Sequence, residues 1–434
     1  MERLIIKGGK QLQGEINCSG AKNSGLPILA ASILINDSVL IGNLPHLKDI
    51  STMLELLNSM GTDICFHENG DIEVDSTKIH TIEARYDLVK TMRASVLVMG
   101  PLVAKYGKAK ISQPGGCNIG ARPINFHLEG LEKMGAQIKS DDKFIYIEAK
   151  KLLPVQFNFP NVSVTGTENL MMASVFVEGK TTLKNCAKEP EVEDLANFLN
   201  SCGAKIEGAG SSVITIEGVH TLKKTHWEVL FDRIEAGTYL VAGAITKGKV
   251  KINKIIPEKL KCLIISLEKM GFTIFCSENS IEIDARTATI KCQDFSTDPY
   301  PGFPTDMQAQ LMALNCIGEG SALITEQVFE NSTYKKIIVT KPVEAVGKDI
   351  GFLPGTLEEK MAPWIAPIKD NLQFLFGDKT ALEMQIDQGT IEIEAMTYIR
   401  GRSIANAFII VDEAQNLTMH ELKTIITRVG DNTK

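Results

Sequence analysis

The sequence predicts an α/β fold built from repeats of about 70 residues. Two patterns predict it. In the first, an apolar helix ends at a glycine before a short strand, with copies at Gly107, Gly179, Gly248 and Gly320 and an earlier copy that has Asn36-Asp37 instead. In the second, a leucine-spaced helix ends in Met-Gly or Cys-Gly before a strand, at Gly61, Gly135, Gly203 and Gly271. A glycine in this place is expected to adopt the left-handed conformation that terminates a helix.

Each repeat is predicted to run helix, strand, helix, strand, strand. The helix over residues 26–34 has small and apolar residues on most of its faces, so we expect it to lie buried between sheets. Strands such as residues 280–284 (Ser-Ile-Glu-Ile-Asp) alternate polar and apolar side chains, which is typical of a sheet with one face in solvent. The predicted architecture therefore places helices inside and strands outside.

Length and composition indicate a globular protein of two or three domains. The chain has 434 residues, of which 44% are hydrophobic and 23% are charged. The net charge of −7 argues against a general nucleic-acid or membrane surface, and no apolar run approaches the length of a membrane span. Residues 1–7 read as a strand and not as a signal peptide, so the expected location is the cytoplasm.

The nine cysteines show neither CxxC motifs nor the spacing of Cys/His metal ligands. We therefore expect a reducing compartment, no disulfide framework and no metal site. Four cysteines lie in apolar runs and are expected to act as small core residues: Cys65, Cys262, Cys276 and Cys316. Cys117 differs, because it lies in a loop rich in glycine and proline (residues 112–123) with Arg122 close by. This setting favours a reactive thiol, and the alternative is a free cysteine in a turn.

Further polar residues precede apolar helices. Lys22 and Asn23 start a buried helix, whose N-terminus is a potential anion site. Arg93 starts another apolar helix, and Asp306 lies just before a third. With Cys117 and Arg122 they indicate a site for an anionic substrate that has one acid/base carboxylate and one thiol. Taken singly, each is more simply explained as an ordinary helix cap or ion pair.

The repeat stops after Asn331, and the following residues differ in kind. Residues 334–342 read as a buried strand that ends at a proline, and a helix that Thr356 could cap should be broken by Pro363 and Pro367. A second buried strand, residues 407–411, precedes Asp412 and Glu413 in a Walker B-like pattern, in which the aspartate reaches Mg²⁺. No GxxxxGK[ST] motif occurs in the chain. The tail is therefore predicted to be part of an α/β sheet.

Residues 1–331 closely resemble the enolpyruvyl transferases, in particular the branch that acts on UDP-N-acetylglucosamine. The resemblance is carried by residues 19–23 (SGAKN), 87–95 (DLVKTMRAS), 114–123 (PGGCNIGARP), 189–191 (EPE), 232–235 (DRIE), 303–310 (FPTDMQAQ) and 328–331 (VFEN). It implies two inside-out α/β barrel domains of three repeats each. The implied boundaries are residues 20–229 for the first domain, and 1–19 with 230–331 for a discontinuous second domain whose last repeat is missing.

The resemblance also implies the chemistry. The enolpyruvyl group of phosphoenolpyruvate would pass to the 3′-hydroxyl of UDP-N-acetylglucosamine by addition and elimination of phosphate, the first committed step of peptidoglycan synthesis. Cys117 would be the general acid and the fosfomycin target, Asp306 would take the hydroxyl proton, and Lys22 and Arg122 would hold phosphoenolpyruvate. The sugar nucleotide would contact Asn23, Arg93, Pro123, Ile124, Asn125, Phe126, Ser163, Val164, Asp306 and Val328. No cofactor or metal is expected for this reaction, and the partners would be the two small-molecule substrates alone.

Residues 333–434 resemble the middle of PhoH-like P-loop ATPases. The motifs are residues 336–342 (KIIVTKP), 347–355 (GKDIGFLPG), 358–364 (EEKMAPW), 398–402 (YIRGR) and 411–416 (VDEAQN). ATP and Mg²⁺ would be ligands only if this fragment, which lacks Walker A, were functional. Two alternatives to the transferase stay open: an ATP-binding or ATP-hydrolysing protein, and a chain that binds UDP-sugar without activity.

Overall fold

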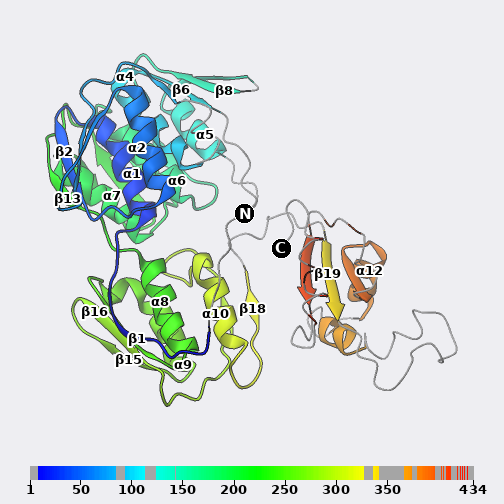
Figure 1. The fold of residues 1–434 in the computed structure, drawn as a ribbon. Coiled ribbons are helices and arrows are strands. Elements are labelled where there is room, and N and C mark those ends of the chain that lie inside the picture. Colours follow the sequence, from blue (N-terminus) through cyan, green and yellow to red (C-terminus); the bar gives the residue numbers. More distant parts are fainter. Residues whose placement is uncertain are drawn as a thin grey trace. The chain divides into compact units, whose positions relative to one another are not determined.

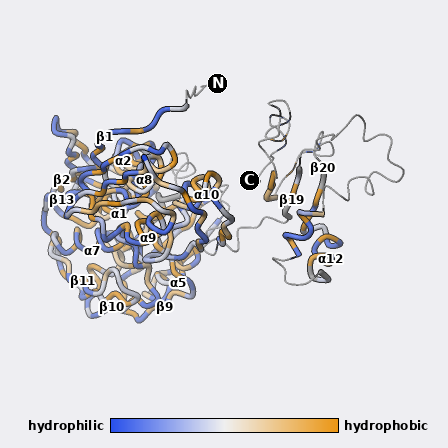
Figure 2. The backbone as a smooth tube through the Cα atoms, turned by 90° about the horizontal axis from the view of Figure 1, so that it is seen from below, coloured by the Kyte–Doolittle hydropathy of each residue, from blue (hydrophilic) through white to orange (hydrophobic). Residues whose placement is uncertain are grey.

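The computed structural model describes residues 8–84, 93–112, 124–141, 143–326, 336–341, 366–373, 379–395 and 407–411, with isolated positions among residues 402–428. The described residues form two compact units, one that reaches residue 326 and one that starts at residue 336 (Figure 1). Along both units, apolar stretches alternate with polar ones, as the hydropathy colouring of Figure 2 shows.

The first unit repeats one pattern of elements, as the sequence predicts. The first repeat is α1 (Lys22–Ala31), η1 (Ser32–Leu34), β2 (Ser38–Gly42), α2 (Lys48–Met60), β3 (Asp63–Phe66) and β4 (Ile72–Asp75). The second is β5 (Glu83–Ala84), η2 (Arg93–Val98), α4 (Met99–Tyr106), β6 (Lys108–Ser112), α5 (Asn125–Lys133), β7 (Gln137–Ser140) and β8 (Phe144–Glu148). The third is β9 (Gln156–Asn158), α6 (Val164–Ser174), β10 (Lys180–Lys184), α7 (Pro190–Ser201), β11 (Lys205–Glu207) and β12 (Val213–Glu217), and β13 (His226–Glu228) follows it.

The pattern continues after residue 232. The fourth repeat is α8 (Arg233–Ile245), β14 (Lys249–Asn253), η3 (Pro257–Leu260), α9 (Lys261–Lys269), β15 (Thr273–Cys276) and β16 (Ser280–Asp284). The fifth is β17 (Phe295–Ser296), η4 (Thr305–Met307), α10 (Gln308–Asn315) and β18 (Ile324–Thr325). The predicted strand over residues 321–324 is therefore shorter than expected, since only its last residue belongs to β18.

The sheets show how neighbouring repeats join. Four sheets have the same form, in which one parallel strand precedes three antiparallel ones: β13-β2-β4-β3, β5-β6-β8-β7, β9-β10-β12-β11 and β1-β14-β16-β15, where β1 is Gln13–Asn17. In two of these sheets the parallel strand comes from a distant part of the chain: β1 pairs with β14, and β13 closes the first three repeats into a ring by pairing with β2. β17 and β18 form the corresponding parallel pair of the fifth repeat.

Two hydrophobic cores lie inside these sheets. The first core joins the buried faces of α1, α2, α4, α6 and α7, and in α1 every residue from Ser24 to Ala31 is buried. The second core is built around α8, α9 and α10 and includes Cys18, which directly follows β1. Helices are thus enclosed by sheets, as the apolar helix faces predict.

The helix-terminating glycines behave as predicted at most positions. Gly61, Gly135, Gly203 and Gly271 all have φ between 95° and 108°, the left-handed region. Gly248 does not, because Lys247 takes the left-handed conformation there, at φ 50°. Gly248 is required for another reason, since a Cβ atom on it would lie 2.1 Å from the carbonyl oxygen of Leu12.

The cysteine prediction is wrong for three of four residues. Cys65, Cys276 and Cys316 are exposed, and Cys262 is half-buried. Cys65 and Cys276 lie on outer strands, where alternation turns them to the solvent face. Cys18, Cys186 and Cys202 are the buried ones among the cysteines that the structure describes.

The second unit contains a three-stranded parallel sheet in the order β20-β19-β21. Its strands are β19 (Lys336–Lys341), β20 (Ile391–Ala395) and β21 (Ala407–Val411), and α12 (Lys379–Asp387) precedes β20. Residues 366–373 are helical, with Pro367 in the first turn, where its missing N–H is tolerated. The two strands predicted for the tail are confirmed. Thr356 and Pro363 lie outside the described residues.

Candidate functional site

The first turn of α1 presents two of the predicted substrate-binding residues. The helix starts at Lys22 after Ala21, and no side chain caps its first backbone N–H groups. Lys22 forms an ion pair with Asp49 on α2, 3.1 Å between Nζ and Oδ2, and Asn23 is exposed. An uncapped helix N-terminus beside a lysine is a favourable place for an anion.

The N-terminus of α6 presents Ser163 and Val164. Ser163 is the N-cap residue, and its hydroxyl oxygen accepts a hydrogen bond of 3.1 Å from the N–H of Gly166. Thr167 donates its hydroxyl hydrogen to the carbonyl of Ser163 at 2.7 Å. Because the cap uses the N–H of Gly166, the preceding N–H groups of this turn stay available to a ligand.

A buried pair, His127 and Asn169, ties together three elements that carry predicted site residues. Asn169 lies on α6, and its side chain accepts from the N–H of Gly100 at 2.5 Å and donates to the carbonyl of Val96 at 2.8 Å. It also donates to Nδ1 of His127 on α5, at 2.9 Å. The segment of Arg93, the helix of Asn125 and Phe126, and the helix of Ser163 are thereby held in one arrangement.

The hydrogen bonds fix the protonation of His127. Nδ1 accepts from Asn169, so the ring is neutral and Nε2 carries the hydrogen, which points to the hydroxyl oxygen of Thr165 at 3.3 Å. Burial lowers the pKa of His127 from its usual 6.5 to about 4, because a charged ring would lose its hydration there. His127 therefore acts as a fixed structural link.

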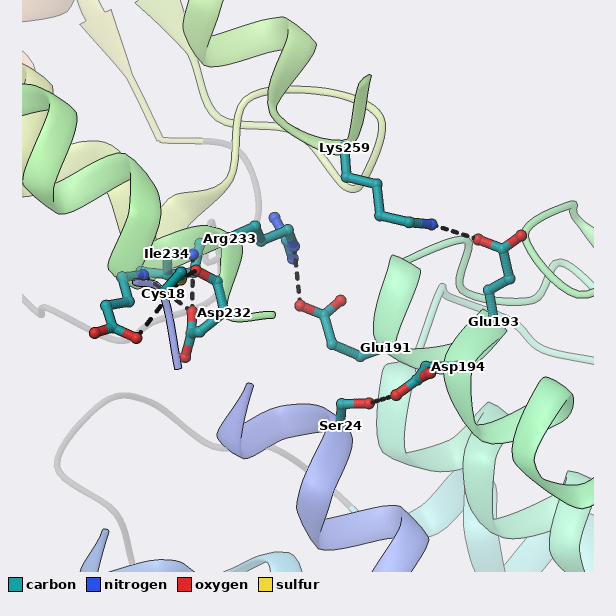
Figure 3. A network of polar contacts seen from close by, with 10 residues as sticks. Cys18, Ser24, Glu191, Glu193, Asp194, Asp232, Arg233, Ile234 and Lys259 are labelled. Carbon is teal, nitrogen blue, oxygen red and sulfur yellow. Dashed lines mark hydrogen bonds and ion pairs between the residues drawn. The ribbon is translucent and has the colours of Figure 1, made fainter. Parts of the chain in front are cut away.

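Asp194 on α7 holds the first turn of α1 and the segment after β13. It accepts hydrogen bonds from the hydroxyl of Ser24, from the N–H of Leu230 at 3.1 Å and from Nε1 of Trp227 at 3.3 Å. Figure 3 shows the Ser24 contact. Burial raises the pKa of Asp194, while these three donors stabilise its charged form.

Three glutamates form an acidic cluster at α6 and α7. Glu168 is buried, and burial together with repulsion from Glu191 and Glu189 raises its pKa well above the usual 4.5. Among the described residues, one carboxylate oxygen of each of these glutamates is buried without a hydrogen-bond partner. Arg233 of α8 compensates in part, because its Nε donates to Glu191 at 2.9 Å (Figure 3).

Asp306 belongs to the second core region. It lies in η4 between Thr305 and the buried Met307, and its own side chain is exposed. Thr305 donates to Glu326 at 3.2 Å, which anchors this turn. Within the part of the chain that the structure describes, no hydrogen bond or ion pair joins Asp306 to Lys22, Asn23 or Ser163.

Several predicted residues lie outside the described residues: Cys117, Arg122, Pro123, Val328, Asp412 and Glu413. Arg93 is described for its backbone only. Of the predicted residues that are described, Asn125 and Phe126 lie at the start of α5 and Val164 at the start of α6, and these two helices contact each other, with Nε2 of His127 3.3 Å from the hydroxyl of Thr165. His127, Asn169 and Asp194 were missed by sequence reasoning. The signal for Asn169 was available, since an amide in a predominantly apolar helix needs a buried partner.

One group among the described residues could ligate a metal ion. His226 lies with its Nε2 3.3 Å from Glu228 and 3.7 Å from Asp71, on the sheet that contains β13 and β4. His226 alone also accounts for the arrangement, because it lies within ion-pair distance of both carboxylates. We assign no metal to them.

The sequence and fold decide the family. A family model described as EPSP synthase (3-phosphoshikimate 1-carboxyvinyltransferase) matches residues 6–335. The chain belongs to the EPSP synthase family. Among the described residues of this family member, no helix combines the length and the apolar composition that a bilayer crossing requires.

Relatives within the family are identical to the chain at about half of the aligned positions. A UDP-N-acetylglucosamine 1-carboxyvinyltransferase of Hydrogenovibrio crunogenus is 49% identical over 331 residues, which are 76% of this chain and 79% of the relative. A protein of the same name from Coxiella burnetii is 48% identical over 351 residues, 81% of this chain and 80% of the relative. The resemblance to the branch of the family that acts on UDP-N-acetylglucosamine is therefore confirmed.

Solved structures confirm the predicted fold class. The enolpyruvyl transferase NikO from Streptomyces tendae aligns with a TM-score of 0.66 at 19% identity, over 78% of this chain and 86% of that chain. EPSP synthase from Acinetobacter baumannii aligns with a TM-score of 0.56 at 18% identity, over 74% and 75%. A family model described as PhoH-like protein matches residues 321–434.

Proposed function

We propose that the chain transfers the enolpyruvyl group of phosphoenolpyruvate to the 3′-hydroxyl of UDP-N-acetylglucosamine and releases phosphate. The observation that carries this proposal is the 49% identity over 331 residues with a relative of that name. The N-terminus of α1 at Lys22 has no side-chain cap, and that of α6 is capped by Ser163 at one N–H group only. Both agree with a site for two anionic substrates. The product would be a precursor of peptidoglycan, made in the cytoplasm without a cofactor.

The proposed reaction has two steps. The hydroxyl oxygen of the sugar attacks C2 of phosphoenolpyruvate while Asp306 takes its proton and Cys117 gives a proton to C3. The tetrahedral adduct then loses phosphate from C2 and a proton from C3, which leaves the enolpyruvyl ether. Lys22 and Arg122 would neutralise the phosphate and carboxylate, so that addition occurs on a polarised enol. The remaining predicted residues would position the sugar nucleotide.

The decisive experiment measures phosphate release from phosphoenolpyruvate in the presence and absence of UDP-N-acetylglucosamine. We expect release that requires both substrates and falls by roughly 10²–10⁴-fold in Cys117→Ala and in Asp306→Asn. Cys276→Ala, which alters an exposed cysteine on an outer strand, should leave the rate unchanged. Substrate-dependent release that persists in Cys117→Ala would contradict the assigned role. Binding of UDP-N-acetylglucosamine without any release would favour the binding-only alternative.

A second candidate function rests on the PhoH-like match over residues 321–434 and on the parallel sheet of the second unit. In such sheets, the carboxyl ends of the strands are where nucleotides bind. Against it stands the absence of a GxxxxGK[ST] motif from the chain. We expect no ATP hydrolysis, and Mg²⁺-dependent hydrolysis that is lost in Asp412→Ala would establish this activity instead.

A further inference from the structure

A pocket in the first unit is lined by residues other than those that we assign to the substrates, although Pro304 and Met307 of its lining lie within two positions of Asp306. Its volume is about 470 Å³, and α8, η3, α9 and the turn before η4 line it. None of Lys22, Asn23, Ile124, Ser163 or Asp306 is among its lining residues. A volume of this size is that of a small-molecule site.

The walls of the pocket are mainly apolar. Leu263 and Met307 are buried beneath it, and Ile234 and Ile265 lie along its sides. Tyr300 adds a flat aromatic face, and the guanidinium carbon of Arg233 lies 5.6 Å from the centre of that ring. Such a surface suits a flat apolar body that stacks on Tyr300.

The polar groups of the pocket are mostly cations. Arg233, Lys259 and Lys261 line it, against the single carboxylate of Glu258, which pairs with Lys261 at 3.3 Å. The side chain of Arg233 is only 12% exposed. Within the described residues, Nε is the only nitrogen of Arg233 that donates a hydrogen bond, and its two terminal nitrogens donate none there. A planar carboxylate is the group that those two nitrogens bind best.

We propose that this pocket is a second ligand site, which takes a small aromatic carboxylate. The carboxylate binds the terminal nitrogens of Arg233, and the ring system lies against Tyr300 and Ile234. Lys259 also lines the pocket. It forms an ion pair with Glu193 of α7 at 2.8 Å, as Arg233 does with Glu191 (Figure 3). A ligand in this pocket therefore contacts Arg233 and Lys259, the two cations whose ion pairs join α7 to α8 and η3.

Cys262 provides a test in the unmodified protein, because its half-buried thiol lines the pocket. The rate of alkylation by iodoacetamide is measured for each cysteine by peptide mass spectrometry, with and without 2-naphthoate. We expect saturating 2-naphthoate to slow alkylation of Cys262 at least fivefold and to leave the exposed Cys276 unchanged. 2-Naphthol, which has the same body without the charge, should require at least a tenfold higher concentration. An unchanged rate at Cys262 under saturating 2-naphthoate would refute the site.

Two variants separate ligand binding from folding. Arg233→Gln should raise the concentration of 2-naphthoate that half-protects Cys262 about tenfold or more. Tyr300→Leu, which removes the stacking face, should raise it several-fold. Arg286→Gln alters an exposed arginine that pairs with Asp284, and it should change nothing. Circular dichroism establishes that each variant is folded, and equal protection in folded Arg233→Gln and in the unmodified chain would overturn the assignment of the carboxylate.

Discussion

Ser24 donates its hydroxyl hydrogen to Asp194, and this contact joins the first turn of α1 to α7. The same carboxylate accepts from Leu230 and from Trp227. One buried side chain thus fixes three segments that are far apart in sequence. Because Lys22 and Asn23 precede Ser24 in that turn, the position of the proposed phosphoenolpyruvate-binding lysine depends on Asp194.

Asp194→Ala should therefore affect both stability and substrate binding. It leaves three donors without their acceptor, and we expect the free energy of unfolding to fall by about 2–4 kcal/mol. In the folded variant, KM for phosphoenolpyruvate should rise more than kcat falls, since Lys22 is displaced without loss of the groups that transfer protons. Urea unfolding and steady-state kinetics measure the two effects. Asp63→Ala, at an exposed carboxylate paired with Lys78, is the matched control and should stay within about 0.5 kcal/mol. An unchanged KM in Asp194→Ala would contradict the positioning role.

His127 should make the protein sensitive to acid. Its pKa is about 4 in the folded chain and 6.5 in the unfolded one, so the unfolded chain binds a proton first as the pH falls. Its contribution to stability is complete above pH 6.5 and is lost between pH 6.5 and 4, by about 3 kcal/mol in all. His127→Gln, which keeps an acceptor for Asn169, should reduce the dependence of the free energy of unfolding on pH between 6.5 and 4, measured by urea titrations. His46→Gln, at an exposed position, should leave this pH dependence unchanged. A slope that is the same in His127→Gln as in the unmodified chain would contradict the prediction.

Glu168 should have the opposite dependence on pH. The pKa of Glu168 is raised in the folded chain. Its contribution to the free energy of unfolding is therefore fully present below pH 4.5 and is lost as the pH rises through the pKa of the folded chain. Glu168→Gln removes the buried charge and its repulsion with Glu189 and Glu191. We expect this variant to be more stable than the unmodified chain at pH 8 by roughly 1–3 kcal/mol and nearly equal to it at about pH 5. Denaturant midpoints at the two pH values give the comparison, and a variant that is less stable at both would show that the carboxylate has an unrecognised partner.

Two helix-terminating glycines allow backbone strain to be separated from steric collision. Gly203 has φ 104°, and no atom lies within 4 Å of the place that a Cβ would occupy, so Gly203→Ala should cost only the left-handed conformation, about 1–2 kcal/mol. Gly61 has φ 108°, and its Cβ would lie 2.3 Å from His80 and 2.7 Å from the carbonyl of Lys78. Gly61→Ala should therefore be clearly less stable than Gly203→Ala. Thermal unfolding compares the stabilities of the two variants. Equal losses of stability would show that residues 78–80 move to accommodate the added methyl group.

The repeat, most of its glycines and its buried helices could be predicted from sequence, because periodicity and helix termination are local properties. The burial of Cys65 and Cys276 could not be judged from apolar neighbours, since alternation along an outer strand decides which side a residue faces. The short β18 and the shift of the left-handed residue from Gly248 to Lys247 depend on contacts between distant segments, such as the approach of Leu12 to Gly248.

The residues proposed to bind the substrates could be predicted from the sequence. The buried residues that hold them in place could not. Lys22 and Asp306 were predicted from their positions before apolar helices, Ser163 was predicted from resemblance to the family alone, and the roles of all three remain predictions. His127, Asn169 and Asp194 bind other protein groups, and which groups they meet is set by tertiary packing. Their sequence neighbourhoods give no indication of partners such as Asn169 for His127, 42 positions away, or Leu230 for Asp194, 36 positions away.

The pairing of β1 with β14 has a consequence for synthesis on the ribosome. Gln13 pairs with Lys249, so β1, the first strand that the structure describes, has no partner until the whole first core has been made. At a synthesis rate of roughly 5–20 residues per second, β1 waits on the order of 10–50 s with its backbone unpaired. The residues of the first core can collapse during that time, whereas the second core cannot be completed before its last contributors are translated. The nascent chain therefore carries an open strand edge for most of its synthesis, which is where chaperone binding or mispairing would occur.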